Sequence, residues 1–291
     1  MDPAILTIDV GTGSARAGLV DLNGNVRALH AVPHKTHYPQ HSWVEQEPDV
    51  WWSGTRTAIR SVMSTAAKQA MEIKAVVSCG QTHATILLDS GGNVLTERAS
   101  LWNDKRAATQ ARAIRARANY HGLQKITGNP AAPSWPGMKL AWYRENEPAK
   151  LDAASVVLMP KDFINFKLSG ETAGDRTEAG YSYLYNWDGD QWDDELCQLL
   201  DVPRRILPTL LGPDGHVGTV RQQIADETGV PPGIPVVVGA GASPAAGLGS
   251  GGCRSGPAAG ISGTSALLAL CPEKPRRRAG GRAAAAAGGG G

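Results

Sequence analysis

The opening of the chain constrains the fold most, because a short apolar run leads through an acidic residue into a glycine-rich turn. Residues 4–8 are mostly aliphatic or β-branched and end at Asp9. Residues 11–13 read Gly-Thr-Gly, and residues 15–20 form a second strand-like run. Glycines allow the chain to reverse tightly. The pattern therefore predicts a hairpin with a carboxylate at the end of its first strand.

The strand pattern continues and then alternates with helical spacing. Asn and Gly at 23–24 both tolerate positive φ and predict a second tight turn, so residues 26–32 complete a three-stranded antiparallel meander. Downstream, apolar residues at helical spacing alternate with short apolar runs of strand length. The further expected elements are helices at 49–70, 105–118 and 138–145, strands at 73–78 and 235–239, and a second hairpin at 86–95.

The turn after Asp9 has the chemistry of a phosphate-binding loop. Glycine N–H groups approach an anion closely, and the hydroxyls of Thr12 and Ser14 add donors. Asp9 can hold Mg²⁺ beside the phosphates, directly or through water. No Gly-Lys-Ser/Thr follows, so the turn differs from a P-loop. Taken alone, the pattern also fits an ordinary hairpin with turn glycines.

Composition excludes several classes of protein. Of the 29 basic and 27 acidic residues, five basic residues and only Glu273 lie in 272–291, so the preceding residues carry a net charge of −2. A nucleic-acid partner is therefore not expected. No apolar run has the length of a membrane span, and the first residues lack a signal-peptide pattern. No C-x-x-C spacing indicates zinc or a disulfide framework, so we expect a cytoplasmic protein; the cysteines are Cys79, Cys197, Cys253 and Cys271.

Further motifs follow the first turn in a fixed order. They are Ser-Trp-Val-Glu-Gln-Glu-Pro at 42–48, Gly-Gln-Thr-His at 80–83, Leu-Trp-Asn-Asp-Lys-Arg at 101–106, Ser-Trp-Pro-Gly-Met-Lys-Leu-Ala-Trp-Tyr-Arg-Glu-Asn at 134–146, Met-Pro-Lys-Asp at 159–162, Gly-Glu-Thr-Ala-Gly-Asp at 170–175 and Ile-Ser-Gly-Thr-Ser-Ala at 261–266. Together they resemble the FGGY carbohydrate-kinase family, most closely its xylulokinase-like branch. Tyr143 departs from the aliphatic residue, Phe or Met that is usual in the 134–146 signature.

The resemblance implies a fold, a domain division and an activity. The fold is the α/β fold of actin-like ATPases and ribonuclease-H-like domains, a mixed sheet with helices on both faces. Residues 1–245 would form the N-terminal domain and 246–270 the start of a truncated second domain. The activity would be phosphorylation of a ketopentose hydroxyl, xylulose- or ribulose-like, with ATP and Mg²⁺. Residues 271–291 have almost no large apolar side chain and predict a disordered low-complexity tail.

The resemblance also assigns roles to individual residues. Asp9 would assist catalysis by holding the metal and the phosphates. The nucleotide-phosphate contacts would be Thr12, Gly13, Ser14, Arg16, Gly263 and Thr264. Thr82 and His83 match the Met-His pair that holds the ketose in xylulokinases, with Thr in place of Met. Asp104 matches the acidic position of the family's Trp-x-Asp-x-Arg segment and would contact the sugar.

Each of these side chains also has a structural interpretation. His83 fits a core histidine as well as a ligand, although its place after a strand end favours the ligand. Asp104 fits the N-terminal cap of the following helix equally well. Trp51 and Trp52 are expected to be packing residues, and Trp102 fits either role.

Two features depart from the family pattern. The family places a catalytic Asp in a Gly-x-Gly-Asp turn after a buried strand, to accept the proton of the sugar hydroxyl. Here Ala242 stands at that position, and no Asp or Glu occurs between Glu227 and Glu273. The chain also stops just after the second Gly-Thr-Ser turn, where family members continue into the domain that carries most of the adenosine pocket.

Three hypotheses follow. The chain is an incomplete copy of a pentulose kinase with impaired activity; or it is a pseudo-kinase that binds sugar without turnover; or it is a scaffold domain that shares only the fold. The first hypothesis is favoured for the origin of the chain, and the second for its present behaviour.

Overall fold

The computed structural model describes residues 1–251, 258–262 and 266–270. The strands are β1 (Asp2–Val10), β2 (Ser14–Asp21), β3 (Val26–Pro33), β4 (Glu45–Gln46), β5 (Met71–Gly80), β6 (Ile86–Leu88), β7 (Ala99–Ser100), β8 (Val156–Leu158), β9 (Gly174–Asp175), β10 (Tyr185–Asn186), β11 (Gln191–Trp192), β12 (Leu210–Leu211), β13 (His216–Thr219), β14 (Pro235–Gly241), β15 (Ala258–Ser262) and β16 (Ala266–Leu270). The helices are α1 (Pro48–Lys68), α2 (Ala108–Arg115), α3 (Tyr120–Thr127), α4 (Pro136–Asn146), α5 (Pro148–Ala153), α6 (Pro160–Ser169), α7 (Arg176–Ala179), α8 (Asp194–Leu199), α9 (Gln222–Thr228) and α10 (Ala242–Gly249), with a 3₁₀ turn at Arg204–Ile206.

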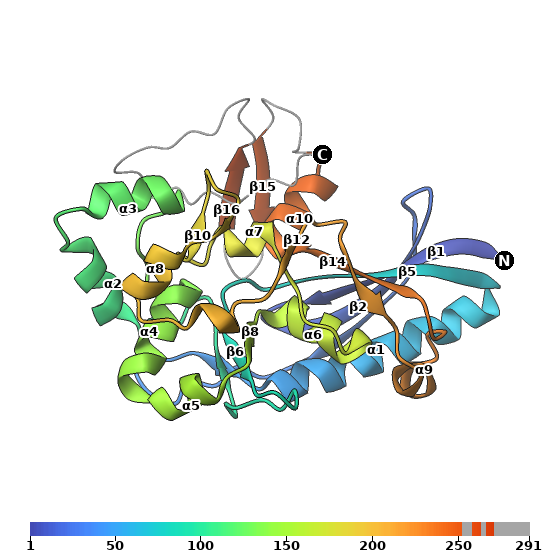
Figure 1. Ribbon diagram of the computed structural model, residues 1–291. Coiled ribbons are helices and arrows are strands. Elements are labelled where there is room, and N and C mark those ends of the chain that lie inside the picture. The colour runs from blue at the N-terminus through green and yellow to red at the C-terminus, as the bar shows by residue number, and fades with distance from the viewer. Residues whose placement is uncertain (252–257, 263–265, 271–291) are drawn as a thin grey trace.

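The centre of the fold is a mixed six-stranded sheet in the order β13-β14-β5-β1-β2-β3 (Figure 1). β1 runs parallel to β5 and antiparallel to β2, β14 runs parallel to β5, and β13 and β3 are antiparallel edge strands. The predicted meander of β1, β2 and β3 is confirmed, as is the α/β class with a mixed sheet.

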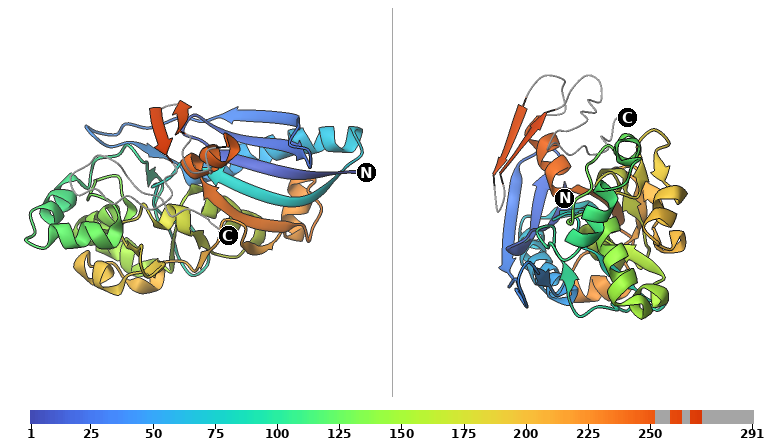
Figure 2. Two further views of the ribbon diagram at one scale, coloured as in Figure 1. Left: turned by 90° about the horizontal axis from the view of Figure 1, so that it is seen from above. Right: turned by 90° about the vertical axis from the view of Figure 1, so that its left-hand side faces the viewer.

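Alternation along β1 shows how the sheet is covered. Ala4, Leu6, Ile8 and Val10 are all at most 1% exposed and belong to the main core, whereas the residues between them are partly exposed. α1 packs on β2 and β3, α6 packs on β14 and β5, and the two helices contact each other, so they cover the same face (Figure 2). α7 and α10 contact the sheet at β14, and α10 also contacts β5.

A second core lies to one side of the sheet, under the helices α2, α3, α4 and α8 (Figure 1). β6 separates the two cores, because Ile86 and Leu88 belong to the main core and Leu87 to the second. The predicted hairpin at 86–95 is only partly correct. Its turn forms, with a bridge between Leu88 and Val94, but the main partner of β6 is the distant strand β8.

The parallel strands β1, β5 and β14 end at the same edge of the sheet. Asp9 pairs with Cys79, and Gly80 pairs with both Val10 and Gly241. The loops that follow these strands must therefore meet, and such an edge is where ligands bind in open α/β sheets. Among the described residues, none of the helices combines the length and apolar character that a membrane span requires.

Candidate active site

The hairpin of residues 9–16, called here the phosphate hairpin, forms where the sequence predicted it. Asp9 lies near the end of β1 and faces Arg16 across the hairpin, where Arg16 Nη1 donates to Asp9 Oδ2 at 2.8 Å. The Gly11 N–H donates to the Ser14 carbonyl at 3.0 Å and closes the turn. Both charged side chains remain partly accessible, 31% for Asp9 and 46% for Arg16.

Gln46 joins the phosphate hairpin to the loop after β5. Its Nε2 donates to the Thr12 carbonyl and to Thr36 Oγ1, each at 2.7 Å. Its Oε1 accepts from Trp51 Nε1 at 2.8 Å and from Gln81 Nε2 at 2.9 Å. A primary amide offers two donors and one oxygen with two lone pairs. Every one of these is used, so the position of Gln46 is fully determined although it lies between two loops.

The predicted phosphate contacts differ in accessibility. Gly13 is exposed and Thr12 is partly exposed, whereas Ser14 is buried. Trp102 Nε1 donates to Thr12 Oγ1 at 3.1 Å, which leaves the hydroxyl hydrogen of Thr12 free to donate. Trp102 thus contacts the phosphate hairpin directly. Trp51 is confirmed as a packing residue within the main core, and Trp52 belongs to the same core.

His83 lies in the loop after β5, where its ring packs against two aromatic side chains. Its backbone has φ of +69°, and its ring meets Trp135 and Tyr181 edge-on with centroid distances of 4.8 and 5.3 Å. Burial, and then the positive charge of Lys139, lower the pKa of His83 to about 3. The imidazole is therefore neutral at physiological pH, and its Nδ1 has no hydrogen-bond partner among the described residues. This nitrogen is itself buried, in a ring enclosed by Trp135 and Tyr181, two residues that had no assigned role from sequence.

Asp104 is not a helix cap, so that interpretation was wrong. The helix α2 begins only at Ala108, and its cap residue makes no side-chain bond. Instead, the fully buried carboxylate of Asp104 accepts from the Val44 N–H at 2.7 Å and from the backbone, Nε and Nη2 of Arg106 at 2.8–3.0 Å. The Arg106 guanidinium stacks on Trp43, 3.7 Å from the ring centroid. A role for Asp104 in sugar contact stays a prediction.

Ala242 begins α10, directly after β14 ends at Gly241. The backbone there is so closely packed that a Cβ on Gly241 would lie 2.7 Å from Thr82 Cγ2 and 3.2 Å from Glu178 Cγ. The Gly241 N–H also donates to Thr177 Oγ1 at 3.1 Å. The structure thus brings the position of the expected general base beside the predicted sugar loop, and the glycine is required for this approach.

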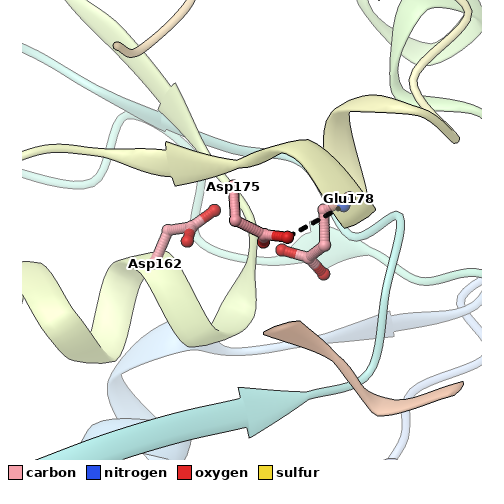
Figure 3. A group of neighbouring side chains, drawn as sticks. All are labelled: Asp162, Asp175 and Glu178. Carbon is pink, nitrogen blue, oxygen red and sulfur yellow. Dashed lines mark hydrogen bonds between the residues drawn. The ribbon is translucent and has the colours of Figure 1, made fainter. Parts of the chain in front are cut away.

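A buried group of four charged residues supports this turn, and three of them come from the motifs at 159–162 and 170–175, although their meeting was not predicted. We call it the carboxylate cluster: Lys161, Asp162, Asp175 and Glu178. Figure 3 shows its three acidic side chains. Lys161 Nζ lies 2.5 Å from Asp162 Oδ1, 2.6 Å from Asp175 Oδ2 and 3.5 Å from Glu178 Oε2. Oxygens of the three acids lie within 4.8 Å of one another. Because the ammonium already lies against them, the cluster is an internal ion-pair network rather than a metal site.

The carboxylate cluster contains three acidic residues and one lysine, and all four side chains are buried away from water. Burial raises the pKa of Asp162 to about 6, opposed by Lys161, and burial raises the pKa of Glu178 well above its ordinary value. Both oxygens of Glu178 lack a hydrogen-bond partner among the described residues. Asp175 also caps α7 by accepting from the N–H groups of Thr177 and Glu178. The cluster therefore fixes α7, whose Thr177 in turn holds the end of β14.

Part of the predicted site lies outside the described residues. This applies to Gly263 and Thr264 of the second phosphate turn and to the tail at 271–291. The flanking strands β15 and β16 pair with each other antiparallel.

A mixed sheet of this topology with packed helices is the fold of the actin-like sugar kinases. The chain belongs to the FGGY family of carbohydrate kinases, since the model of that family's N-terminal domain matches residues 4–249. The Klebsiella pneumoniae xylulose kinase is 32% identical over 261 residues, which are 89% of this chain and 53% of that protein. The Nitrobacter hamburgensis glycerol kinase is 29% identical over 241 residues, 81% of this chain and 47% of that protein.

Solved structures agree with this assignment. The xylulose kinase from Rhodospirillum rubrum superposes with a TM-score of 0.84 at 28% identity, covering 88% of this chain and 52% of that one. Plasmodium falciparum glycerol kinase with ADP gives a TM-score of 0.85 at 22% identity, covering 92% and 54%, and supports the fold alone. The chain spans about half the length of the curated relatives it matches.

Proposed function

We propose that this chain is the sugar-binding half of an ATP-dependent kinase that phosphorylates a hydroxyl of a ketopentose in carbohydrate metabolism. The single observation that carries the proposal is the meeting of three loops at one sheet edge. These are the phosphate hairpin, the loop of Gln81 to His83, and the turn from Gly241 into Ala242. Phosphoryl transfer requires donor and acceptor to be held side by side, which this edge provides.

The residues at this edge fit ATP and Mg²⁺. Asp9 offers a partly accessible carboxylate beside a glycine turn, the combination that suits a hard cation next to phosphate oxygens. Thr12 and Gly13 offer a free hydroxyl hydrogen and exposed backbone. When bound, Mg²⁺ would neutralise charge on the transferred phosphoryl group. The residues of this chain would bind the phosphates and orient the sugar hydroxyl.

The neutral His83 is suited to a sugar. A neutral imidazole can exchange a hydrogen bond with a hydroxyl through a ring nitrogen, and the rings of Trp135 and Tyr181 pack against it. The aromatic rings supply apolar surface and the imidazole supplies a polar group, the combination that is typical of small-molecule sites. We infer that Thr82 and His83 contact the ketose. Asp104 would hold the loop that follows β7 in place through its ion pair with Arg106.

A second function is favoured by Ala242 alone. Without a carboxylate there, no side chain of that turn can accept the sugar proton, and Glu178 is buried in the carboxylate cluster. We therefore propose that this chain transfers phosphate slowly or not at all. In that case it acts as a sugar-binding pseudo-kinase or a scaffold domain.

A ketose panel tests the proposed function. The melting temperature would be measured with D-xylulose, D-ribulose, xylitol and glycerol. A ligand at a hundred times its Kd stabilises the folded state by about 2.7 kcal/mol. His83→Asn is the matched variant, because Asn tolerates the positive φ that His83 adopts, and it should lose most of the ketose shift. If no ketose or polyol stabilises the wild-type chain, the sugar-binding assignment is wrong.

A further inference from the structure

Lys139 is a fully buried lysine whose ammonium lies among backbone carbonyls. Its Nζ donates to the carbonyls of Leu101 at 2.6 Å, His83 at 2.7 Å and Ser100 at 3.0 Å. In the part of the chain that the structure describes, it forms no ion pair. Lys161, also fully buried, lies instead against carboxylates. A buried charge normally requires a partner of opposite sign, so the setting of Lys139 needs an explanation.

The three carbonyls belong to two different loops of the candidate site. His83 lies in the loop after β5, whereas Ser100 ends β7 and Leu101 leads directly to Trp102, which contacts Thr12. The lysine itself projects from α4, in the neighbouring core. One ammonium therefore joins both predicted ketose loops to a third element, α4.

The number of N–H bonds makes this contact dependent on protonation. An ammonium has three N–H donors, which match the three carbonyls one to one. A neutral amine has only two, so one carbonyl would lose its lysine donor; Leu101 would keep the Asp104 N–H at 3.1 Å, whereas the lysine is the donor that the His83 carbonyl has among the described residues. An unpaired buried carbonyl is costly, and the loop that carries it would be free to move.

We propose that Lys139 is a positioning residue that holds the His83 loop and the Ser100–Leu101 loop in their ketose-binding arrangement. The proposal rests on the proposed function for the identity of the ligand, but not for the contact between lysine and loops. Deprotonation of the ammonium would loosen one of these loops and weaken ketose binding.

The surroundings of Lys139 place the deprotonation of its ammonium near neutral pH. Burial lowers its pKa to about 7, with Asp104 raising it and Arg106 lowering it. Arg106 is itself paired with Glu45, 2.6 Å away. His83, with a pKa of about 3, stays neutral throughout this range. The loops should therefore be better held below pH 7 than above it.

Amide hydrogen exchange of the free protein tests the contact directly. In Lys139→Met, the amides of residues 81–85 and 99–104 should lose protection by about tenfold beyond any change elsewhere in the chain. The control is Met138→Ala, a buried neighbour on the same helix, which should lower protection across the chain without favouring the two loops. Equal losses in the loops for both variants would overturn the proposal.

The wild-type protein supplies a second test that does not depend on folding of a variant. Protection factors of the two loops, corrected for intrinsic exchange, should fall between about pH 6 and about pH 8.5, across the pKa of about 7 for Lys139. In Lys139→Met this fall should be absent. Loops that are equally protected at both pH values in the wild type would refute the role of the ammonium.

Ketose titrations separate this proposal from the proposed function. With D-xylulose or D-ribulose, wild-type affinity should fall about tenfold over the same pH range, and Lys139→Met should bind weakly and without pH dependence. If the wild type binds no ketose at either pH, the proposed function fails, and the exchange data alone decide the role of Lys139. Equal affinity and equal pH dependence in wild type and variant would show that Lys139 does not position the loops.

Discussion

Replacing Lys161 by Met should show how much the carboxylate cluster depends on its one cation. The ammonium lies 2.5 Å from Asp162 and 2.6 Å from Asp175, and all three side chains are at most 4% exposed. Methionine keeps the apolar stem but removes the charge, so the acids would face one another without a counterion. Breaking a buried ion pair by removing one partner costs about 3–5 kcal/mol. We expect the free energy of unfolding to fall by about this amount at neutral pH.

The pH dependence follows from the same group of residues. Burial raises the pKa of Asp162 to about 6, above its ordinary value, and that of Glu178 also lies above its ordinary value. The folded state therefore binds more protons than the unfolded state. The stability that this contributes is complete below about pH 4 and is lost as the pH rises through about 6. Without Lys161 the repulsion at neutral pH is larger, so acidification should relieve more of it. The difference between wild type and variant should shrink on going from about pH 7.5 to about pH 5.

Urea denaturation followed by tryptophan fluorescence at both pH values measures these quantities. Lys150→Met is the matched control, because Lys150 is 45% exposed and pairs with Glu147 on the surface. It should change stability by less than about 0.5 kcal/mol. A Lys161→Met protein within about 1 kcal/mol of wild type at neutral pH would refute the reasoning, as would a difference that grows on acidification.

The remaining predictions concern the end of β14, the start of α10 and the buried Arg106. Ala242→Asp should raise the rate of ketopentose phosphorylation about 10²–10⁴-fold, because it restores a proton acceptor, measured by coupled ADP release with a ketopentose panel. Gly239→Ala should destabilise the fold by about 2 kcal/mol or more in thermal unfolding, because φ is +71° and the new Cβ would lie 1.8 Å from the Ser78 carbonyl oxygen. Arg106→Lys should cost about 2–3 kcal/mol in urea, since lysine cannot reproduce the forked contact with Asp104.

Controls for these variants come from the same chain. Gly233→Ala shares the positive φ but meets no atom within 4 Å, so it isolates backbone strain from the clash; equal effects at 233 and 239 would contradict the steric argument. Arg112→Lys changes an exposed arginine and should be nearly neutral, and an Arg106→Lys protein as stable as this control would show that the fork is not required. Robust turnover of the unmodified chain would show that Ala242 does not replace an essential base.

Local patterns predicted the elements that position the site. The aliphatic and β-branched run at residues 4–8, the Gly-Thr-Gly turn and the Asn-Gly turn predicted the meander, because both turns are set by the residues within them. The Pro-Asp pair at 48–49 gave the start of α1. The strand at 235–239 continues to Gly241, as the close approach of its glycines to β5 allows.

The rest depends on contacts between residues far apart in sequence. Asp104 has the sequence pattern of a helix cap, yet its carboxylate turns inward to Arg106, and α2 starts a turn later than its alanine-rich composition predicts. The pairing of β6 with β8 joins strands about seventy residues apart. Asp162 and Asp175 each belong to a local motif, but only the packed fold shows that they share one lysine. No periodicity in the sequence carries that information.

The four hydrogen bonds of Gln46 have a consequence for motion. Because one amide is bonded to Thr12 on the phosphate hairpin and to Gln81 on the sugar loop, neither segment can shift by an ångström without stretching a bond to the other. Trp102 adds a second link, through Thr12 Oγ1. The phosphate hairpin and the loop of Gln81 to His83 should therefore move together as one rigid unit. Any opening to admit substrate would then swing this unit against another part of the protein, with the hinge outside the sheet edge itself.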